Sequence, residues 1–196
     1  MYLLLHDTSG EALTAIAPAL RTAWRAAQVE PFILKPAEVE RLARVFPAKL
    51  LDIQAHHIAL AGEDPFAGLE VAREPLRLHL EQSLRNLALR LRRRYVAVFD
   101  DPAALAQALA NITIPLKVDL TGLLRLAQKG EPAEATSAAV FAAAAAAFSL
   151  DGAALARLAA LRQQTQLPDD LPGLYQSVAA TVAQAAEVAD RLKESQ

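Results

Sequence analysis

The strongest constraint on the fold is a run of leucines at helical spacing between residues 75 and 98. Apolar side chains recur there in steps of three and four residues, at Leu76, Leu80, Leu84, Leu87, Leu91, Tyr95 and Val98. Such steps place all of them on one face of an α-helix. A helix with a single leucine stripe has to bury that stripe against other helices. Residues 75–98 therefore predict one long member of an antiparallel helical bundle.

The composition agrees with a largely helical protein. Hydrophobic residues make up 54% of the 196 residues but aromatic residues only 5%, so the core has to be built from leucine, alanine and valine. Alanine and leucine are among the best helix formers. The net charge of −2 gives no overall attraction to nucleic acid or to anionic membranes. The chain has no cysteine, which excludes disulfides, thiolate nucleophiles and cysteine-based zinc sites.

The first 72 residues have a different pattern, because short apolar runs alternate with helical segments. Three of these runs predict strands, at Tyr2–Leu5, Pro31–Lys35 and Lys49–Ile53. A helix ending near Gln28 follows the first strand, and Thr8 and Glu11 have the spacing of a capping box at its start. A second helix is expected between Pro36 and Pro47. This order of strands and helices predicts a small α/β layer.

From residue 73 onward only helices are expected. After the leucine-striped helix, further helices are predicted at about 102–111, 114–128, 133–148, 151–164 and 171–194. Asp101, Asp151 and Asp170 stand where N-cap residues belong, and Pro102 stands at a first helical position. The predicted fold class is therefore α+β. A domain with about three strands occupies residues 1–72, and a larger all-α antiparallel bundle occupies residues 73–196.

Residues 45–95 also carry a family resemblance. Its features are Val45-Phe46-Pro47, Leu51-Asp52-Ile53, Gly62-Glu63-Asp64 and the helix that contains Leu76-Arg77, Glu81, Leu84-Arg85 and Leu91-Arg92. They resemble a bacterial nucleotidyltransferase-like family, in which a small catalytic α/β domain precedes a helical bundle of the substrate-binding type. The resemblance extends from about residue 2 to residue 192 and is most specific between residues 45 and 95. It implies that residues 1–72 form a partial nucleotidyltransferase fold.

The resemblance also implies a metal-dependent site, of which this sequence holds only a part. In that family a Gly-Ser turn holds the nucleotide phosphates, and two aspartates with a third carboxylate on a later strand bind Mg²⁺. Met1 and Tyr2 stand near the places of the two aspartates, and no Gly-Ser turn precedes them. Asp52 stands at a place suited to the third carboxylate. It is either a remnant of the metal site or a polar residue on the outer face of a strand.

Five arginines follow closely on one another in the leucine-striped helix, at Arg85, Arg90, Arg92, Arg93 and Arg94. Two interpretations stay open. The arginines form a solvated or salt-bridged helix face, with Glu81 paired to Arg85, or they bind phosphate or carboxylate in a cleft. The resemblance points to Glu81, Arg85 and Arg92 as the candidate anion- or substrate-binding residues. Few aromatic residues are interleaved with the arginines, so nucleic-acid binding is not expected.

Other polar residues are expected to have structural roles. Asp7 ends the first predicted strand and suits a turn. His56 and His57 are adjacent, and adjacent strand residues point to opposite faces, so they would not ligate one ion together. A solvated loop pair is the favoured interpretation, and no metal site is predicted. The sequence contains neither a Gly-x-Ser-x-Gly elbow nor a glycine-rich phosphate loop.

These observations favour a nucleotidyltransferase-like protein that is truncated or degenerate, is inactive as an isolated chain, and acts as a binding or scaffold module. No cofactor is then expected for this chain alone. The alternative is a Mg²⁺-dependent nucleotidyltransferase that uses an NTP and a small-molecule acceptor. It requires that an upstream start or a partner chain supply the missing segment. A third hypothesis is a purely structural helical module.

The expected partner follows from the first strand. Tyr2–Leu5 is predicted to be an open sheet edge, whose unpaired backbone groups would attract another strand. We therefore expect a homodimer or a partner chain to cover it. The N-terminal segment MYLLLHDTSG has no basic region before an apolar core, and no apolar run is long enough to span a bilayer. A cytoplasmic protein without membrane contact is expected.

Overall fold

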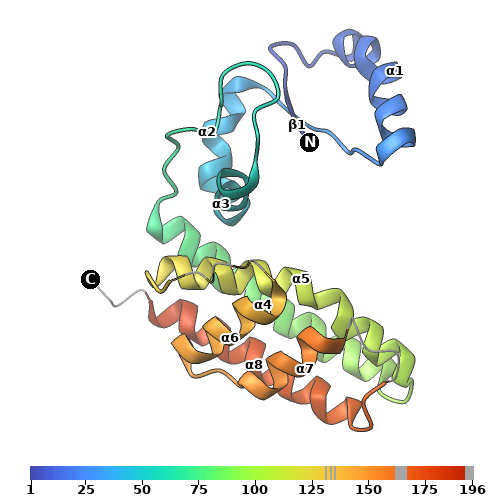
Figure 1. Cartoon of the computed structure of the whole chain (residues 1–196), viewed down its shortest axis with the longest axis vertical. Helices are drawn as coiled ribbons and strands as arrows, with labels where there is room; N and C mark the ends of the chain where they lie inside the picture. Colours follow the sequence, from blue (N-terminus) through green and yellow to red (C-terminus); the bar gives the residue numbers. More distant parts are fainter. Residues whose placement is uncertain (131, 133, 135, 162–166, 193–196) are drawn as a thin grey trace. The chain divides into compact units, whose positions relative to one another are not determined.

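The computed structural model describes residues 1–130, 132, 134, 136–161 and 167–192, except for the side chains of Asp52 and His56. The chain divides into two compact units, Met1–Ala72 and Arg73–Gln196. The protein is mostly helical, with one small parallel sheet in the first unit (Figure 1). Among the helices of the described ranges, none combines the length and the apolar character that crossing a membrane would require.

The first unit contains a two-stranded parallel sheet and three helices. Strand β1 (Tyr2–Leu4) pairs with strand β2 (Phe32–Leu34), so the first two predicted strands are confirmed in shortened form. Helix α1 (Gly10–Ala27) connects the strands, and α2 (Pro36–Val45) and α3 (Pro47–His56) follow β2. The small core consists of side chains from β2, α2, α3 and the loop after α3, namely Leu34, Val39, Leu42, Leu50, Ile53 and Phe66.

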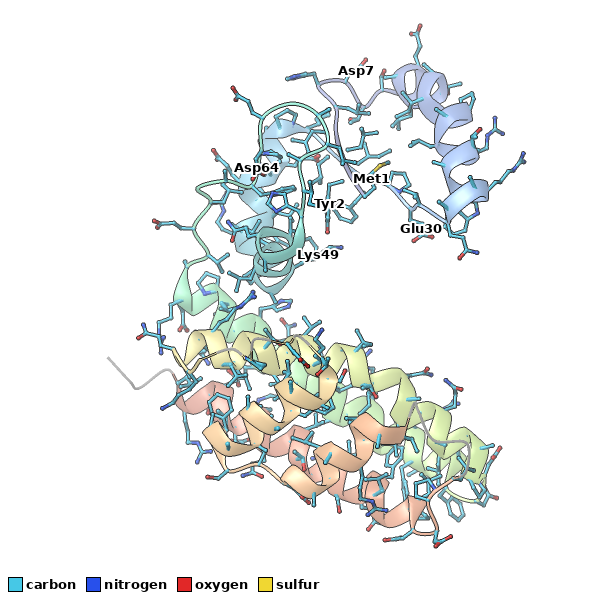
Figure 2. All side chains as sticks on the ribbon, in the orientation of Figure 1. Met1, Tyr2, Asp7, Glu30, Lys49 and Asp64 are labelled. Carbon is cyan, nitrogen blue, oxygen red and sulfur yellow. The ribbon has the colours of Figure 1, made fainter. Side chains whose placement is uncertain are left out.

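The start of α1 depends on Asp7, which acts in a turn as expected. Its carboxylate accepts hydrogen bonds from the backbone N–H and the hydroxyl of Ser9, at 2.8 and 3.0 Å, and the backbone bond lowers the pKa of Asp7. Ser9, rather than the predicted Thr8, then caps the helix by accepting from the N–H of Ala12. Figure 2 shows Asp7 before α1 and Glu30 after it; the Glu30 carbonyl accepts from the amino group of Met1.

The predicted third strand, Lys49–Ile53, is wrong, because these residues lie in α3. Pro47 occupies the first helical turn, where its missing N–H costs nothing and its fixed φ angle favours a helix. The buried side chains of this segment include Leu50 and Ile53, three residues apart, which is helical spacing rather than strand alternation. Gln54 follows them and donates hydrogen bonds to the carbonyls of Phe66 and Leu69. Asp52 therefore lies on a helix and not on a strand.

The second unit is a helical bundle. Its helices are α4 (Arg73–Val98), α5 (Pro102–Leu126), α6 (Ser137–Phe148), α7 (Gly152–Leu161) and α8 (Leu171–Arg191). Helix α4 packs against α5 and α8, while α6 and α7 pack against each other and against α5. The leucine stripe of α4 is buried, as predicted, from Leu76 to Leu91. The caps at Asp101, Asp151 and Asp170 are confirmed, because each side chain accepts a hydrogen bond from the N–H three residues later.

Helix α5 corrects the prediction of two helices at 102–111 and 114–128. It runs without a break through Pro115. A proline inside a helix costs about 3 kcal/mol, but a continuous row of buried leucines on both sides of it, including Leu109, Leu116 and Leu120, holds the helix together. The ends of the helices predicted at 151–164 and 171–194 lie partly outside the described residues, as does the start of the one at 133–148.

Helices α4 and α5 run in opposite directions, and two hydrogen bonds between them fix their register. Arg73 donates to the carbonyl of Leu126, and Ser83 donates to Asp119 at 2.8 Å. Residue numbers therefore rise along α4 as they fall along α5. Positions 83, 87, 90 and 94 share one face of α4, since they are separated by four, three and four residues. That face lies opposite residues 119 to 108 of α5.

Candidate functional site

A cavity of about 530 Å³ lies in the helical bundle and is lined by α4, α5 and Tyr175 of α8. We call it the α4–α5 cavity. Its apolar lining comes from Leu87, Leu91, Ala97, Ala108, Ile112, Pro115 and Tyr175. Small side chains at positions 97 and 108 leave space that larger ones would fill. Pro115 has no N–H to donate to the carbonyl of Asn111, which also lines the cavity. The volume falls in the range of small-molecule sites.

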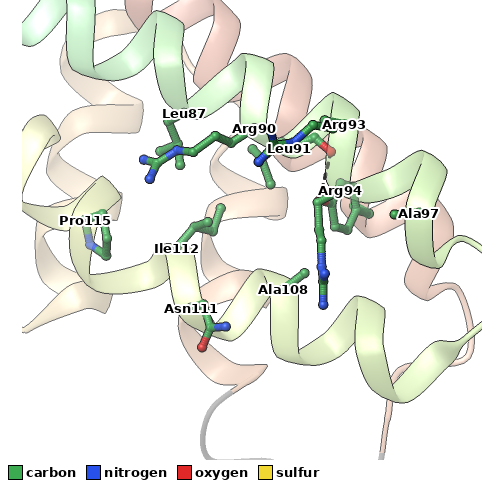
Figure 3. A pocket seen from close by; sticks show the side chains of 11 residues that line it. Leu87, Arg90, Leu91, Arg93, Arg94, Ala97, Ala108, Asn111, Ile112 and Pro115 are labelled. Atoms are coloured by element: carbon green, nitrogen blue, oxygen red, sulfur yellow. Dashed lines mark hydrogen bonds between the residues drawn. The ribbon is translucent and has the colours of Figure 1, made fainter.

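The polar lining of the cavity is dominated by arginine. Arg90, Arg93 and Arg94 contribute from α4, and Asn111 contributes from α5. Figure 3 shows the side chains of Arg90 and Arg94 extending from α4 toward α5. Within the described part of the chain, no carboxylate forms an ion pair with any of these three arginines. Cationic forks next to an apolar wall are suited to an organic anion.

Tyr175 is held rigidly at the wall of the cavity. Its side chain is buried, and its hydroxyl donates a hydrogen bond to the carbonyl of Leu91 at 3.0 Å, the dashed line in Figure 3. Burial raises the pKa of Tyr175. A neighbouring tyrosine, Tyr95, lies against it with ring centroids 5.2 Å apart. The cavity wall formed by α4 and α8 is therefore fixed by a buried hydrogen bond and by aromatic packing.

The predicted binding residues Glu81 and Arg85 lie elsewhere on α4, in a network of ion pairs. Glu81 accepts from Arg77 and from Arg85, each at 2.9 Å, and Arg85 also reaches Glu187 of α8 at 3.1 Å. Arg77 is buried, with 2% of its surface exposed, and pairs with Glu74 as well. Hydrogen bonds from Arg85 and Arg77 lower the pKa of Glu81. The structure brings these residues together as a charge-compensated link between α4 and α8.

Arg92, the third predicted binding residue, is exposed and is not among the residues that line the α4–α5 cavity. It follows Leu91 by one position, so its side chain leaves α4 about 100° away from the leucine stripe. Glu81, Arg85 and Arg92 consequently do not converge on one cavity. Of the arginines singled out in the sequence, Arg90, Arg93 and Arg94 do.

Next to the cavity lies a buried carboxyl that the sequence pattern did not single out, Asp119 of α5. Only 4% of its surface is exposed, and Ser83 of α4 donates a hydrogen bond to it at 2.8 Å. Burial raises the pKa of Asp119 from its ordinary 3.8 to about 6, although the bond from Ser83 and the charge of Arg90 act in the opposite direction. Asp119 can therefore exchange a proton near neutral pH.

The catalytic candidate Asp52 cannot be placed in a site. Its backbone lies in α3, and its side chain lies outside the described residues. Among the side chains that the structure describes, no group of three or more histidines, cysteines, aspartates or glutamates is arranged to hold a metal ion.

His57 pairs with Asp64, whereas a solvated loop pair of His56 and His57 was predicted; the side chain of His56 lies outside the described residues. Its Nε2 lies 2.8 Å from the Asp64 carboxylate, and its Nδ1 lies 2.7 Å from the carbonyl of Ile53. The bond to Asp64 is the main cause of a raised His57 pKa. Asp64 also accepts from the N–H of Phe66. Because both ring nitrogens of His57 face acceptors within the first unit, the His57–Asp64 pair holds the loop after α3 in place.

No protein-family model matches this chain, and neither a curated protein nor a solved structure matches it. The resemblance seen in the sequence therefore stays a prediction, and the candidate site depends on its own geometry. The arginine-lined cavity had one signal in the sequence. Arg90 and Arg94 follow Leu87 by three and seven residues, so they share the face of α4 that turns toward α5, whereas Arg92 does not.

Proposed function

We propose that this protein is a binding module whose helical bundle takes up an organic anion in the α4–α5 cavity. One observation carries the proposal. Three arginines line a largely apolar cavity, and none of them has an ion-pair partner among the described residues. A guanidinium binds a phosphate, sulfonate or carboxylate by parallel hydrogen bonds. The leucines, Ile112, Pro115 and Tyr175 would bury the apolar part of the same ligand.

The contrast within α4 supports this assignment. Arg77 and Arg85 are neutralised by three glutamates, Glu74, Glu81 and Glu187. An arginine that serves only solubility or helix stability gains from such pairing. Arg90 and Arg94 instead face a cavity in which their charges repel each other. An anion placed between them would relieve that repulsion and supply the missing hydrogen bonds.

A titration with naphthalene-2-sulfonate, followed by isothermal calorimetry at low salt, tests the proposal. This probe combines an apolar ring system with one permanent negative charge. The matched neutral control is naphthalene-2-sulfonamide. We expect the double variant Arg90→Gln/Arg94→Gln to bind the sulfonate about tenfold more weakly or worse. Arg92→Gln, which changes an exposed arginine of the same helix outside the cavity, should bind within about twofold of the unchanged protein.

Two results would overturn the proposal. Equal binding of the sulfonate and the sulfonamide would show a merely apolar cavity. Equal weakening by Arg92→Gln and by Arg90→Gln/Arg94→Gln would show unspecific attraction to the charge of α4. In that second case the predicted set of Glu81, Arg85 and Arg92 would regain support.

We further propose that this module belongs with nucleotidyltransferase-like proteins and has no catalysis of its own, acting as a scaffold. The sequence features between residues 45 and 95 support this, together with an α+β chain whose helical unit follows a small unit with a parallel sheet. A partial nucleotidyltransferase fold in residues 1–72 and an antiparallel order of all the bundle helices are parts of the same proposal. Mg²⁺-dependent turnover of an NTP by the purified chain, abolished by Asp52→Ala, would contradict it.

A homodimer through the first unit is a separate proposal. Strand β1 has one neighbour in the sheet, β2, and α1 contributes no buried residue among those described. Trp24 and Leu13 of α1 are exposed, and both an open sheet edge and exposed apolar side chains are surfaces that a second copy could cover. Light scattering coupled to size-exclusion chromatography should give twice the mass of one chain. A monomer at millimolar concentration would contradict the dimer and leave the anion site untouched.

A further inference from the structure

We propose that Asp119 is a positioning residue of the α4–α5 cavity, whose carboxylate competes with a bound anion for the charge of Arg90, so that anion binding is coupled to proton uptake. This inference depends on the anion-binding function proposed above. It adds that the affinity of the α4–α5 cavity for an anion depends on pH.

The geometry places Asp119 beside the cavity without exposing it to the cavity. Ser83, Leu87 and Arg90 follow one another on the same face of α4. Opposite them, Asp119 and Pro115 are one turn apart on α5, and Leu87, Arg90 and Pro115 line the cavity. Asp119 itself is 4% exposed and bound to Ser83. Because Asp119 is buried, its charge acts on Arg90 with less screening than the charge of a solvated carboxylate would.

Asp119 is largely ionised at pH 7 and takes up its proton as pH falls through about 6, because burial raises its pKa to about 6. When ionised, it attracts Arg90 and repels an incoming anion. When protonated, it does neither, and it keeps the hydroxyl of Ser83 as a hydrogen-bond partner. An anion bound at Arg90 thus favours the protonated form of Asp119, and by reciprocity the protonated form favours the anion. Binding should tighten as pH falls from 8 to 5.

The other ionisable groups near Asp119 do not account for such coupling. On α4, His79 lies one turn before Ser83, and burial lowers its pKa; the variant His79→Gln below separates its titration from that of Asp119. Helix α6 carries no ionisable residue. On α7, Arg157 donates to the carbonyl of Asp170, and on α8 Glu187 pairs with Arg85. The remaining ionisable groups of α5 and α8 are Lys117, Arg125, Tyr175, Asp190 and Arg191.

The test measures the affinity for naphthalene-2-sulfonate between pH 5 and pH 8, a range in which the probe keeps its charge. We expect the unchanged protein to bind on the order of fivefold more tightly at pH 5 than at pH 8. Calorimetry at pH 6.5 in two buffers with different ionisation heats should show uptake of a fraction of one proton. Asp119→Asn should bind with the low-pH affinity at every pH and without proton uptake.

Two further variants keep the test decisive. His79→Gln should leave the pH profile unchanged. Ser83→Ala removes the hydrogen bond that stabilises the carboxylate, so the midpoint of the profile should move to higher pH, and this shift decides the matter even if Asp119→Asn fails to fold. Affinity that is independent of pH in the unchanged protein, or a profile that persists in Asp119→Asn or follows His79, would overturn the inference. Failure of the sulfonate to bind at any pH would overturn the proposed function first.

Discussion

The two ends of α4 use the same residue types for opposite purposes. In the first half, Arg77 and Arg85 are joined by Glu81 into a network that reaches Glu187 on α8. In the second half, Arg90 and Arg94 line a cavity and have no ion-pair partner among the described residues. One half binds the bundle together, and the other leaves charge available at the surface of an apolar space.

The difference arises from where carboxylates stand, both along α4 and on the helices that pack against it. The first half of α4 supplies its own acids at spacings of three and four residues, and α8 adds Glu187. The second half has no acid between Glu81 and Asp100, and the facing part of α5 presents Ala108, Ile112 and Pro115. Whether an arginine of α4 is neutralised therefore depends on whether a carboxylate reaches it within about one helical turn, and only the arginines left without such a partner are available to the proposed anion.

The largest effect on stability is expected from Asp119→Asn. This variant tests whether the buried carboxyl of Asp119 responds to pH differently from the ion-paired glutamates of α4. The folded-state pKa of Asp119 is raised to about 6 from 3.8. The folded state therefore holds this proton more tightly, and its stability falls as pH rises from 4 to 6, by about 3 kcal/mol in total. Asp119→Asn should remove this loss. Urea unfolding followed by circular dichroism at pH 4, 5, 6 and 7.5 measures it.

The exposed Asp100 provides the matched control, since Asp100→Asn removes a carboxyl from the same unit without touching the bundle core. The difference in unfolding free energy between Asp119→Asn and Asp100→Asn should grow with pH in favour of Asp119→Asn. A difference that stays constant from pH 4 to pH 7.5 would show that Asp119 does not titrate in the folded protein within this range.

Glu81→Ala should have the next largest effect, because it takes a partner from a buried guanidinium. Arg77 would keep only Glu74, and Arg85 only Glu187. Removing a partner from a buried pair costs about 3 to 5 kcal/mol; the remaining partners reduce this to about 2 kcal/mol. The pKa of Glu81 is lowered, so its contribution is present above its ordinary pKa of 4.5 and is lost as pH falls. The same urea series measures this contribution at each pH. A destabilisation by Glu81→Ala that grew as pH fell would contradict the prediction.

The sequence predicted the helical unit well because its signals are local. The leucine stripe of α4 and the caps at Asp101, Asp151 and Asp170 depend on residues within four positions of one another, and the structure confirms them. Lys49–Ile53 failed as a strand because a run of five apolar and mixed residues fits both periodicities. Pro47 and the burial of Leu50 and Ile53 against Phe66 favour the helix over the strand, and Phe66 lies farther along the chain.

The candidate site was harder to predict, since its residues meet only through the pairing of α4 with α5. The sequence identified the arginine cluster but could not tell which members face α5. Ser83 and Asp119 are 36 residues apart, and nothing local marks either as part of a site. The continuity of α5 through Pro115 decides the register between them, whereas two separate helices, at 102–111 and 114–128, were predicted.

A smaller effect is expected for Arg85→Ala. Its side chain is about half exposed, at 46%, and it makes one ion pair within α4 and one with α8. Exposed pairs of this kind contribute about 0.5 to 1 kcal/mol together. The loss should shrink when the salt concentration is raised to about 1 M, because screening weakens exposed pairs. Thermal unfolding at low and high salt measures both values, and a loss that salt leaves unchanged would place Arg85 among the buried charges with Arg77.

The smallest effect on the free energy of unfolding is expected for Arg90→Gln and Arg94→Gln, the variants that test directly how the two halves of α4 differ. An arginine that binds the bundle together destabilises it when removed. Arg90 and Arg94 have no ion-pair partner among the described residues, and Arg90 would lose only its attraction to the ionised carboxylate of Asp119. Each variant should change the free energy of unfolding by less than about 0.5 kcal/mol, and relief of the repulsion between the two guanidiniums favours a slight gain. Urea unfolding without ligand measures this. A loss comparable to that of Glu81→Ala would mean that Arg90 and Arg94 stabilise the bundle as Arg77 does, and the division of α4 into a structural and a ligand-binding half would then be abandoned.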